Sequence, residues 1–463
     1  MDKTQIRAYF DTHIGRQPGT KIQYGHPSPR FWQPTRLDVE QVAAMRRPDR
    51  ELVLYLHIPF CPQTDPPACG FCLFAREDFH GYPAVETYLE YLRRELQRYA
   101  AAFGGERLAA VYFGGGTPNI LKPQDYARVM GWIRAEFELA PGAEVTLEGV
   151  PQLFTDERLA AMAEAGITRV SVGAQQLQDH LIEYSGRRQT AEQVFRAIER
   201  AHELEMVANV DLICGWFDQR EDDLVADLER LVPLRPESIV VHPLTLAGPS
   251  HFSQERARLP SVDETCATFL RGRRFLEANG YWGSSYADYM LDDPPRGPAE
   301  VQYLLYYRDI LRYDRLGVGY GANSLFAGTL ERPAMTYRNI DRTQGYYEAL
   351  DADELPTLEG FGFTAEDLRL LYVMKGLEGT PFLRASRYAA DFGRDLGEDF
   401  ADLWAVLEDM GWLEIIDADL YRLRDAAVFY TPMIQRCLAE ERNAVLRRSA
   451  PSRHRSLPQV HGV

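Results

Sequence analysis

The chain has 463 residues, of which 45% are hydrophobic and 26% are charged. This composition is ordinary for a globular protein and excludes a chain that is disordered throughout. The 51 basic and 68 acidic residues give a net charge of -17, which argues against nucleic acid as the main partner. No apolar run approaches the roughly 18 residues that a membrane-spanning helix needs, so we expect no membrane partner.

Short runs rich in β-branched and aromatic residues alternate along the chain with longer runs at helical spacing. The expected strands are residues 51–58, 108–113, 144–148, 168–173, 206–213 and 238–244. The expected helices between them are residues 83–103, 122–137, 156–165, 190–204 and 219–232. Such alternation predicts an α/β fold with parallel strands, either a doubly wound sheet or an open βα barrel.

The rest of the chain is less regular. Residues 1–50 contain a Pro-, Gly- and aromatic-rich stretch and are expected to form an irregular N-terminal arm. Residues 51–350 hold the βα units and an extension that contains a helix over 266–279 and the run LGVGYGANS. Residues 351–446 have mostly helical patterns with a strand pair near 412–423, which is typical of a small winged-helix-like domain. Residues 447–463 are basic and rich in Pro and Ser, which predicts a disordered tail.

Residues with reactive or ligand-binding side chains follow the ends of the expected strands. Cys61 follows the first strand, the run from Gly114 to Thr117 follows the second, and Glu148, Gln175 and Asp211 follow or end the next three. Both candidate architectures place function at the C-terminal ends of parallel strands. We therefore expect these residues to meet on one rim.

Three of the six cysteines, Cys61, Cys69 and Cys72, have the spacing C-x7-C-x2-C. Three soft thiolates so close together indicate a metal site. Zinc would need a fourth ligand, for which His57 or His80 is available. A 4Fe–4S cluster held by three cysteines would keep one iron open to a substrate or cofactor.

The residues around these cysteines resemble a known family. YLHIPFC and CGFC contain the cysteines, and GGGTP, VTLEGVP, AGITRVSVGAQ, NVDLICG and DRLGVGYGANS follow in order. As a set they resemble the radical S-adenosylmethionine (SAM) superfamily, and more narrowly the HemN-like family of oxygen-independent coproporphyrinogen III oxidase. The resemblance implies an open, three-quarter βα barrel of about six parallel strands with a small helical C-terminal domain. It also implies a 4Fe–4S cluster, one or two SAM molecules, and a reducing, cytoplasmic compartment.

The resemblance assigns roles to individual residues. Cys61, Cys69 and Cys72 would be the cluster ligands and catalytic residues. Gly115 and Gly116 would let the backbone approach the methionine part of SAM. The other SAM-binding residues would be Tyr55 near the sulfonium, Thr117 through its hydroxyl, Glu148 at the ammonium, Gln175 and Asp211 at the ribose, and Arg187 at the carboxylate. Each role has a plainer structural interpretation. The glycines would form a tight turn, Tyr55 would be a core side chain, Glu148 would be a solvated carboxylate and Arg187 would be a surface charge.

Three departures from the family bear on the substrate. The first cysteine gap holds seven residues where the superfamily has three, and Phe74 stands where the oxidase has a further cysteine. The stretch 302–309 lacks the histidine of the haem-carrier branch. We therefore expect hydrogen abstraction from a small organic substrate, as in methylation or cyclopropanation of a natural product, with flavodoxin or ferredoxin as the reducing partner. Oxidative decarboxylation of coproporphyrinogen III and haem carriage are the alternatives.

Overall fold

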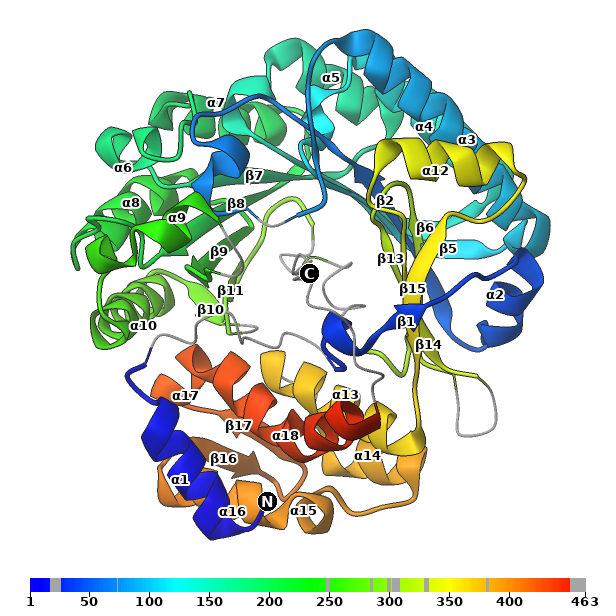
Figure 1. Ribbon diagram of the computed structural model, residues 1–463. Helices are drawn as coiled ribbons and strands as arrows, with labels where there is room; N and C mark the ends of the chain where they lie inside the picture. Colours follow the sequence, from blue (N-terminus) through cyan, green and yellow to red (C-terminus); the bar gives the residue numbers. More distant parts are fainter. Residues whose placement is uncertain are drawn as a thin grey trace.

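The computed structural model describes residues 1–16, 26–72, 74–246, 250–283, 286–297, 301, 309–328, 333–379 and 383–449. The predicted tail from residue 450 onward and the stretch 302–308 lie outside the described residues. Figure 1 shows an incomplete ring of strands with helices on its outer side and a separate helical layer below the opening.

The strands of the main sheet are β1 (Gln33–Pro34), β2 (Glu51–Ile58), β5 (Arg107–Gly115), β6 (Glu138–Gly149), β7 (Arg169–Gln175), β8 (Val207–Cys214), β9 (Ser238–Pro243), β10 (Tyr281–Gly283), β11 (Asp288–Leu291), β12 (Tyr313–Val318), β13 (Asn323–Phe326), β14 (Met335–Asn339) and β15 (Thr357–Gly362). Their order is β1-β15-β14-β13-β12-β2-β5-β6-β7-β8-β9-β11-β10. Strands β2, β5, β6, β7, β8 and β9 are consecutive parallel neighbours. They are the six predicted strands, so the expected open βα barrel is confirmed.

One parallel strand was not anticipated. Strand β12 lies parallel to β2 and contains the start of the glycine-rich run. The edges of the sheet are antiparallel: β13, β14 and β15 follow β12 on one side, and β11 and β10 follow β9 on the other. Because β15 belongs to this sheet, the barrel unit continues past residue 350, where the sequence analysis ended it.

Helices surround the sheet (Figure 1). They are α3 (Tyr82–Phe103), α4 (Pro123–Glu136), α5 (Asp156–Ala165), α6 (Asp179–Glu183), α7 (Ala191–Glu203), α8 (Asp223–Leu231), α9 (His251–Gln254), α10 (Val262–Ala278) and α12 (Thr343–Asp351). Their apolar faces form the core with the outward-facing side chains of the strands, as Leu92 and Leu96 of α3 do with Leu54 and Leu56 of β2, all with no exposed surface. Removing such side chains from water is the main stabilising contribution.

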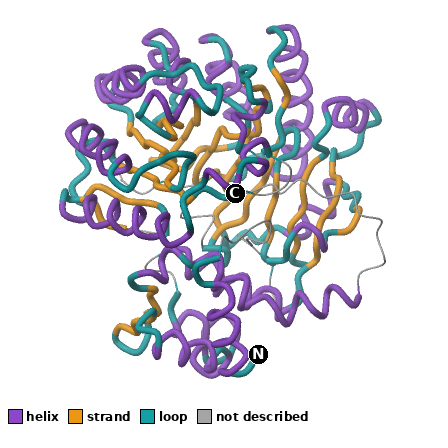
Figure 2. The backbone as a smooth tube through the Cα atoms, turned by 60° about the vertical axis from the view of Figure 1, so that its left-hand side comes forward, coloured by secondary structure: helices purple, strands orange, loops and turns teal. Residues whose placement is uncertain are grey.

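The C-terminal helical layer comprises α13 (Ala365–Glu378), α14 (Ala385–Phe392), α15 (Leu396–Asp399), α16 (Ala401–Asp409), α17 (Ala426–Phe429) and α18 (Thr431–Ser449), with a hairpin of β16 (Leu413–Ile416) and β17 (Leu420–Leu423). The hairpin lies where the strand pair was predicted. Figure 2 shows this layer projecting from the barrel, with the N-terminus beside it.

The N-terminal arm is more regular than predicted. It contains α1 (Lys3–His13), which packs against α16 and α18, and α2 (Val39–Met45), which packs against α3. Asp2 and Asp38 each accept a hydrogen bond from the backbone N–H of the Gln three residues later, whose side chain bonds back. These capping boxes stabilise the first turn of both helices, which the sequence analysis read as irregular chain.

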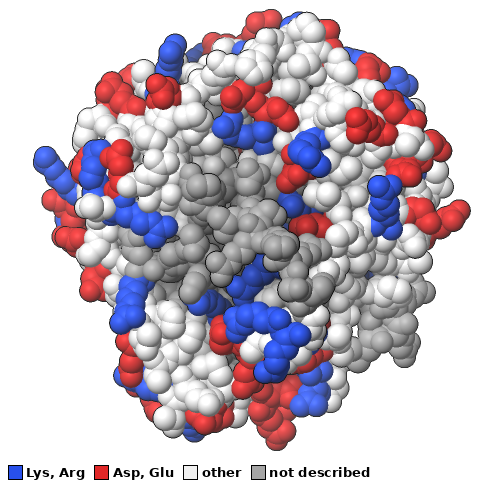
Figure 3. All heavy atoms as spheres, viewed as in Figure 1, with Lys and Arg blue, Asp and Glu red and all other residues white. Residues whose placement is uncertain are grey.

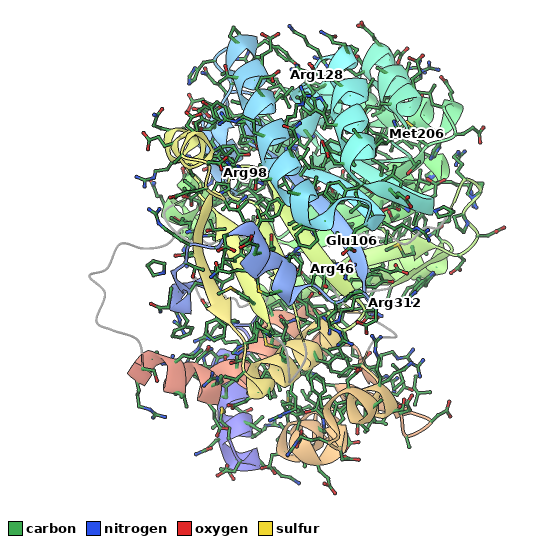
Figure 4. All side chains as sticks on the ribbon, turned by 90° about the vertical axis from the view of Figure 1, so that its right-hand side faces the viewer. Arg46, Arg98, Glu106, Arg128, Met206 and Arg312 are labelled. Atoms are coloured by element: carbon green, nitrogen blue, oxygen red, sulfur yellow. The ribbon has the colours of Figure 1, made fainter. Side chains whose placement is uncertain are left out.

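Buried ion pairs join the arm to the barrel. Arg46, after α2, contacts Glu106 at 2.6 Å and Asp314 at 3.1 Å, and Figure 4 shows Arg46 and Glu106 side by side. Arg50 contacts the same Asp314 at 3.4 Å. Losing one partner from such a buried group leaves a charge uncompensated, so these contacts fix the chain where it enters β2.

On the described part of the face in Figure 3, basic and acidic side chains alternate around the edge. Within the described ranges, every helix is too short or too polar to cross a bilayer.

Candidate functional site

The predicted site residues meet at the C-terminal rim of the parallel strands. In the strand register His57 of β2 is opposite Gly114 of β5, Glu148 of β6 is opposite Ser171 of β7, and Gly173 is opposite Asp211 of β8. The sheet thus brings Tyr55, Gly115, Gly116, Glu148, Gln175 and Asp211 to the same edge from five neighbouring strands or their ends. Cys61 follows β2 directly.

The three cysteines lie in the segment that leaves β2. Cys61 ends β3 (Phe60–Cys61), which pairs with β4 (Glu77–Asp78), and Cys69 lies in the short helix η3 (Pro67–Gly70). The Thr117 hydroxyl donates to the Sγ of Cys61 at 3.4 Å, and the Nε of Arg187 donates to the Sγ of Cys69 at 3.4 Å. Both contacts favour the thiolate form, which is the form that binds metal.

The protonation of these thiols also depends on their burial. Burial raises the pKa of Cys61, partly offset by the bond from Thr117, and burial raises the pKa of Cys72 to about 12. Cys69 raises the pKa of Cys61 further, and Cys61 and Cys69 raise the pKa of Cys72 further. Metal binding would therefore displace protons from this group.

The donor set fits an iron–sulfur cluster by its chemistry: three soft sulfurs, with an Oγ–H and a guanidinium directed at two of them. Across the described ranges, no three His, Cys, Asp or Glu side chains are grouped to hold a metal ion.

The two histidines considered as a fourth zinc ligand are otherwise engaged. The Nε2 of His57 lies 2.8 Å from the carbonyl oxygen of Ala75, and its Nδ1 lies 3.1 Å from the Tyr55 hydroxyl. A carbonyl can only accept, so Nε2 carries the proton and Nδ1 accepts from Tyr55. His80 is exposed and its Nδ1 bonds to Gln63 at 2.9 Å. These contacts leave the three cysteines as the candidate donor set.

The glycines after β5 are needed for local packing. Gly115 has a φ of +113°, and a Cβ there would lie 2.8 Å from the His57 ring. A Cβ on Gly116 would lie 2.4 Å from the carbonyl oxygen of Pro59. The turn therefore packs directly against the segment that leads to Cys61, which supports the tight-turn interpretation and leaves the approach of SAM to be tested.

Glu148 has partners that the sequence analysis missed. The Tyr112 hydroxyl donates to its carboxylate, and the backbone N–H of Gly115 does so too. Burial raises the pKa of Glu148 to about 7, and the nearby Asp211 adds to this, while the Tyr112 bond opposes it. Tyr112 also stacks on Tyr55, with ring centroids 6.3 Å apart. These two hydrogen bonds within the site argue against a fully solvated carboxylate.

Asp211 is oriented by a polar network inside the barrel. Its Oδ2 accepts from the Ser171 hydroxyl at 2.7 Å and its Oδ1 from the Asn209 amide at 2.9 Å. Asn209 in turn accepts from Ser238 at 2.7 Å. Burial raises the pKa of Asp211, and the Ser171 bond opposes this. Asn209 precedes the predicted site residue Asp211 by two positions, so the strand alternation could have found it.

Gln175 and Arg187 lie next to each other at the end of β7. Gln175 has a left-handed φ of +65°, which turns the chain at the rim. The Nη1 of Arg187 donates to the Gly173 carbonyl at 2.6 Å and to Gln189 Oε1 at 3.1 Å. Arg187 is therefore half-buried in the site and is not a surface charge.

The chain is similar to several known proteins. Residues 55–231 match the model of the radical SAM superfamily. The heme chaperone HemW of Escherichia coli K12 is 28% identical over 325 residues, covering 69% of this chain and 83% of its own. The oxygen-independent coproporphyrinogen III oxidase of the same organism is 26% identical, covering 77% of this chain and 79% of its own.

The solved structure of E. coli coproporphyrinogen III oxidase superposes with a TM-score of 0.76 at 23% identity, covering 90% of this chain and 97% of that one. This likeness shows the fold. Together with the superfamily match over residues 55–231 and the two relatives, it supports a HemN-like radical SAM protein.

Proposed function

We propose that the protein is a radical SAM enzyme in which Cys61, Cys69 and Cys72 hold a 4Fe–4S cluster with one open iron for SAM. The observation that supports the proposal is that Thr117 and Arg187, which lie at the rim with Glu148 and Asp211, donate hydrogen bonds to the sulfurs of Cys61 and Cys69. When bound and reduced, such a cluster supplies the electron that splits SAM into methionine and a 5′-deoxyadenosyl radical.

The residues of this chain would bind and orient SAM for that step. Glu148 would accept a hydrogen bond from the SAM ammonium, and Arg187 would pair with the SAM carboxylate through its fork of donors. Asp211, held by two hydrogen bonds, would accept from the ribose hydroxyls together with Gln175. Thr117, Gly115 and Gly116 would face the methionine part, and Tyr55 would lie near the sulfonium, where an aromatic face favours a cation.

For the reaction we propose hydrogen abstraction from a small organic molecule, leading to methylation or cyclopropanation of a natural product. Support comes from Phe74, which is 40% exposed at the position of the oxidase's further cysteine. The protein would use one or two SAM molecules and take electrons from a flavodoxin or ferredoxin. Decarboxylation of coproporphyrinogen III and haem carriage are second candidates, because two relatives are named as an oxidase of coproporphyrinogen III and as a heme chaperone.

Anaerobic reconstitution with iron and sulfide separates these functions. The reduced protein is incubated with SAM alone, with SAM and coproporphyrinogen III, and with haem. The proposal predicts 5′-deoxyadenosine in both SAM arms and no protoporphyrinogen IX. Conversion of coproporphyrinogen III would establish the oxidase instead, and stoichiometric haem binding without SAM cleavage would establish a carrier.

A further inference from the structure

The enlarged segment between Cys61 and Cys69 is not a free loop but packs on the chain that follows α6. Gly186 has a φ of +69°, and a Cβ there would lie 2.2 Å from the carbonyl oxygen of Asp65 and 2.7 Å from its nitrogen. The backbone of the loop therefore lies directly on the Cα of Gly186, at a distance that only glycine permits.

The next residue contacts the cysteine itself. Arg187 donates through Nε to the Sγ of Cys69 and through Nη1 to the Gly173 carbonyl, at 3.4 and 2.6 Å. The guanidinium thus joins the sulfur to the end of β7. Its Nη2 makes no hydrogen bond within the described part of the chain, so it remains for the carboxylate of SAM.

The loop has internal contacts that direct Cys69 toward Arg187. The backbone N–H of Cys69 donates to the Thr64 hydroxyl at 3.0 Å, and that hydroxyl donates to the Pro66 carbonyl at 2.8 Å. Ala68 and Cys69 have left-handed φ values of +58° and +52°. Side chains rarely adopt this conformation, so it persists only where surrounding contacts impose it.

Aromatic residues hold the other end of the segment. A Cβ on Gly70 would lie 2.5 Å from the Phe252 ring, and Phe71 meets the Trp216 ring edge-on at 5.1 Å between centroids. Both ends of the Cys69 turn are thus fixed by parts of the barrel distant in sequence.

We propose that Gly186 and Arg187 are positioning residues for Cys69: the enlarged loop packs on them, and this contact places the sulfur before the cluster is assembled. The inference rests on the proposed function for the identity of the cluster. It assigns Arg187 a role in cluster loading in addition to its role at SAM.

The test measures the loop in iron-free protein and the cluster separately. Hydrogen exchange of peptides covering residues 62–72 reports the docking, and iron and sulfide per chain after anaerobic reconstitution report the loading. Gly186→Ala is compared with Gly393→Ala, because Gly393 has a similar φ of +64° but no atom within 4 Å of its Cβ position. Arg187→Gln is compared with Arg188→Gln, at the exposed neighbour.

Gly186→Ala and Arg187→Gln are expected to exchange at least about tenfold faster over 62–72 and to bind less than about half of the wild-type iron. Arg187→Lys keeps the positive charge but not the forked donors of the guanidinium. Its exchange rate and iron content are expected to lie between those of these two variants and those of wild type. Thermal unfolding checks that each variant folds; if Gly186→Ala does not, Arg187→Gln decides the test.

Exchange and iron content equal to those of the two controls would overturn the inference while leaving the proposed function intact. A wild-type protein that takes up no iron and sulfide would instead overturn the proposed function. In that case the exchange measurement on iron-free protein still decides whether the loop packs on Gly186 and Arg187.

Discussion

The hydroxyl of Tyr112 on β5 donates a hydrogen bond to the carboxylate of Glu148 on the adjacent strand β6. Burial nevertheless keeps the pKa of Glu148 at about 7. Below this pH the group is neutral, and above it the carboxylate is available to a cation.

The affinity for SAM should therefore rise with pH between about 6 and 8, by up to about tenfold for each pH unit. The physical reason is that only ionised Glu148 attracts the SAM ammonium. Equilibrium dialysis of the cluster-loaded protein at several pH values measures the affinity. Glu148→Gln should flatten the profile, and Tyr112→Phe should move its midpoint upward by removing a donor to the carboxylate; an unchanged slope in Glu148→Gln would rule out this role.

Gly116→Ala should destabilise the fold and lower the cluster content, because its Cβ would overlap the Pro59 carbonyl. We expect a loss of about 1–3 kcal/mol in the free energy of unfolding. Gly131 in α4 has open space around its Cβ position, so Gly131→Ala should stabilise by about 0.4–1 kcal/mol. Urea unfolding of the iron-free variants measures both changes in unfolding free energy. Equal changes for Gly116→Ala and Gly131→Ala would contradict the packing argument.

Asp367 joins the arm to the C-terminal layer. Its carboxylate accepts from His26 at 2.6 Å and from two nitrogens of Arg442 at 2.8 and 2.9 Å, with no exposed side-chain surface. Although burial raises its pKa, the bonds from His26, Arg442 and Thr364 outweigh this and leave the pKa well below the ordinary range.

Asp367→Asn should therefore cost about 3 kcal/mol of unfolding free energy near neutral pH. Because the folded pKa lies below the unfolded one, the contribution is full above about pH 5 and is lost as the pH falls below about 4. Urea unfolding across this range measures it. Glu354→Gln, which breaks the exposed pair with Arg36, should change stability by less than about 1 kcal/mol at any pH; a loss as large as that of Asp367→Asn would refute the distinction.

The barrel was predictable because each parallel strand is a short apolar run that the sequence marks directly. Strand β12 was missed because Gly317 within it and the glycines that follow it weaken the strand signal. It forms through pairing with β2, far away in sequence. Helices α1 and α2 were missed because they are short, at 11 and 7 residues, and because their capping boxes begin with Asp and close with Gln.

The expectation that Glu148 and Asp211 lie on one rim could be drawn from the sequence. The positions of the expected strands and their parallel order determine which residues reach that rim. The partners of those residues depend on side-chain reach. Tyr112 on β5 reaches Glu148 on the adjacent strand β6, and Arg187 reaches Cys69 from 118 positions away. No local pattern encodes such contacts, which explains why Arg187 could be assigned only by resemblance.

Cleavage of SAM tests the central claim most directly. Cluster-loaded protein is reduced with dithionite under strict exclusion of oxygen, and 5′-deoxyadenosine and methionine are quantified by mass spectrometry. The account predicts both products in equal amounts from wild type, and neither from Cys61→Ser, Cys69→Ser or Cys72→Ser. Intact SAM after incubation with fully loaded, reduced wild-type protein would contradict it.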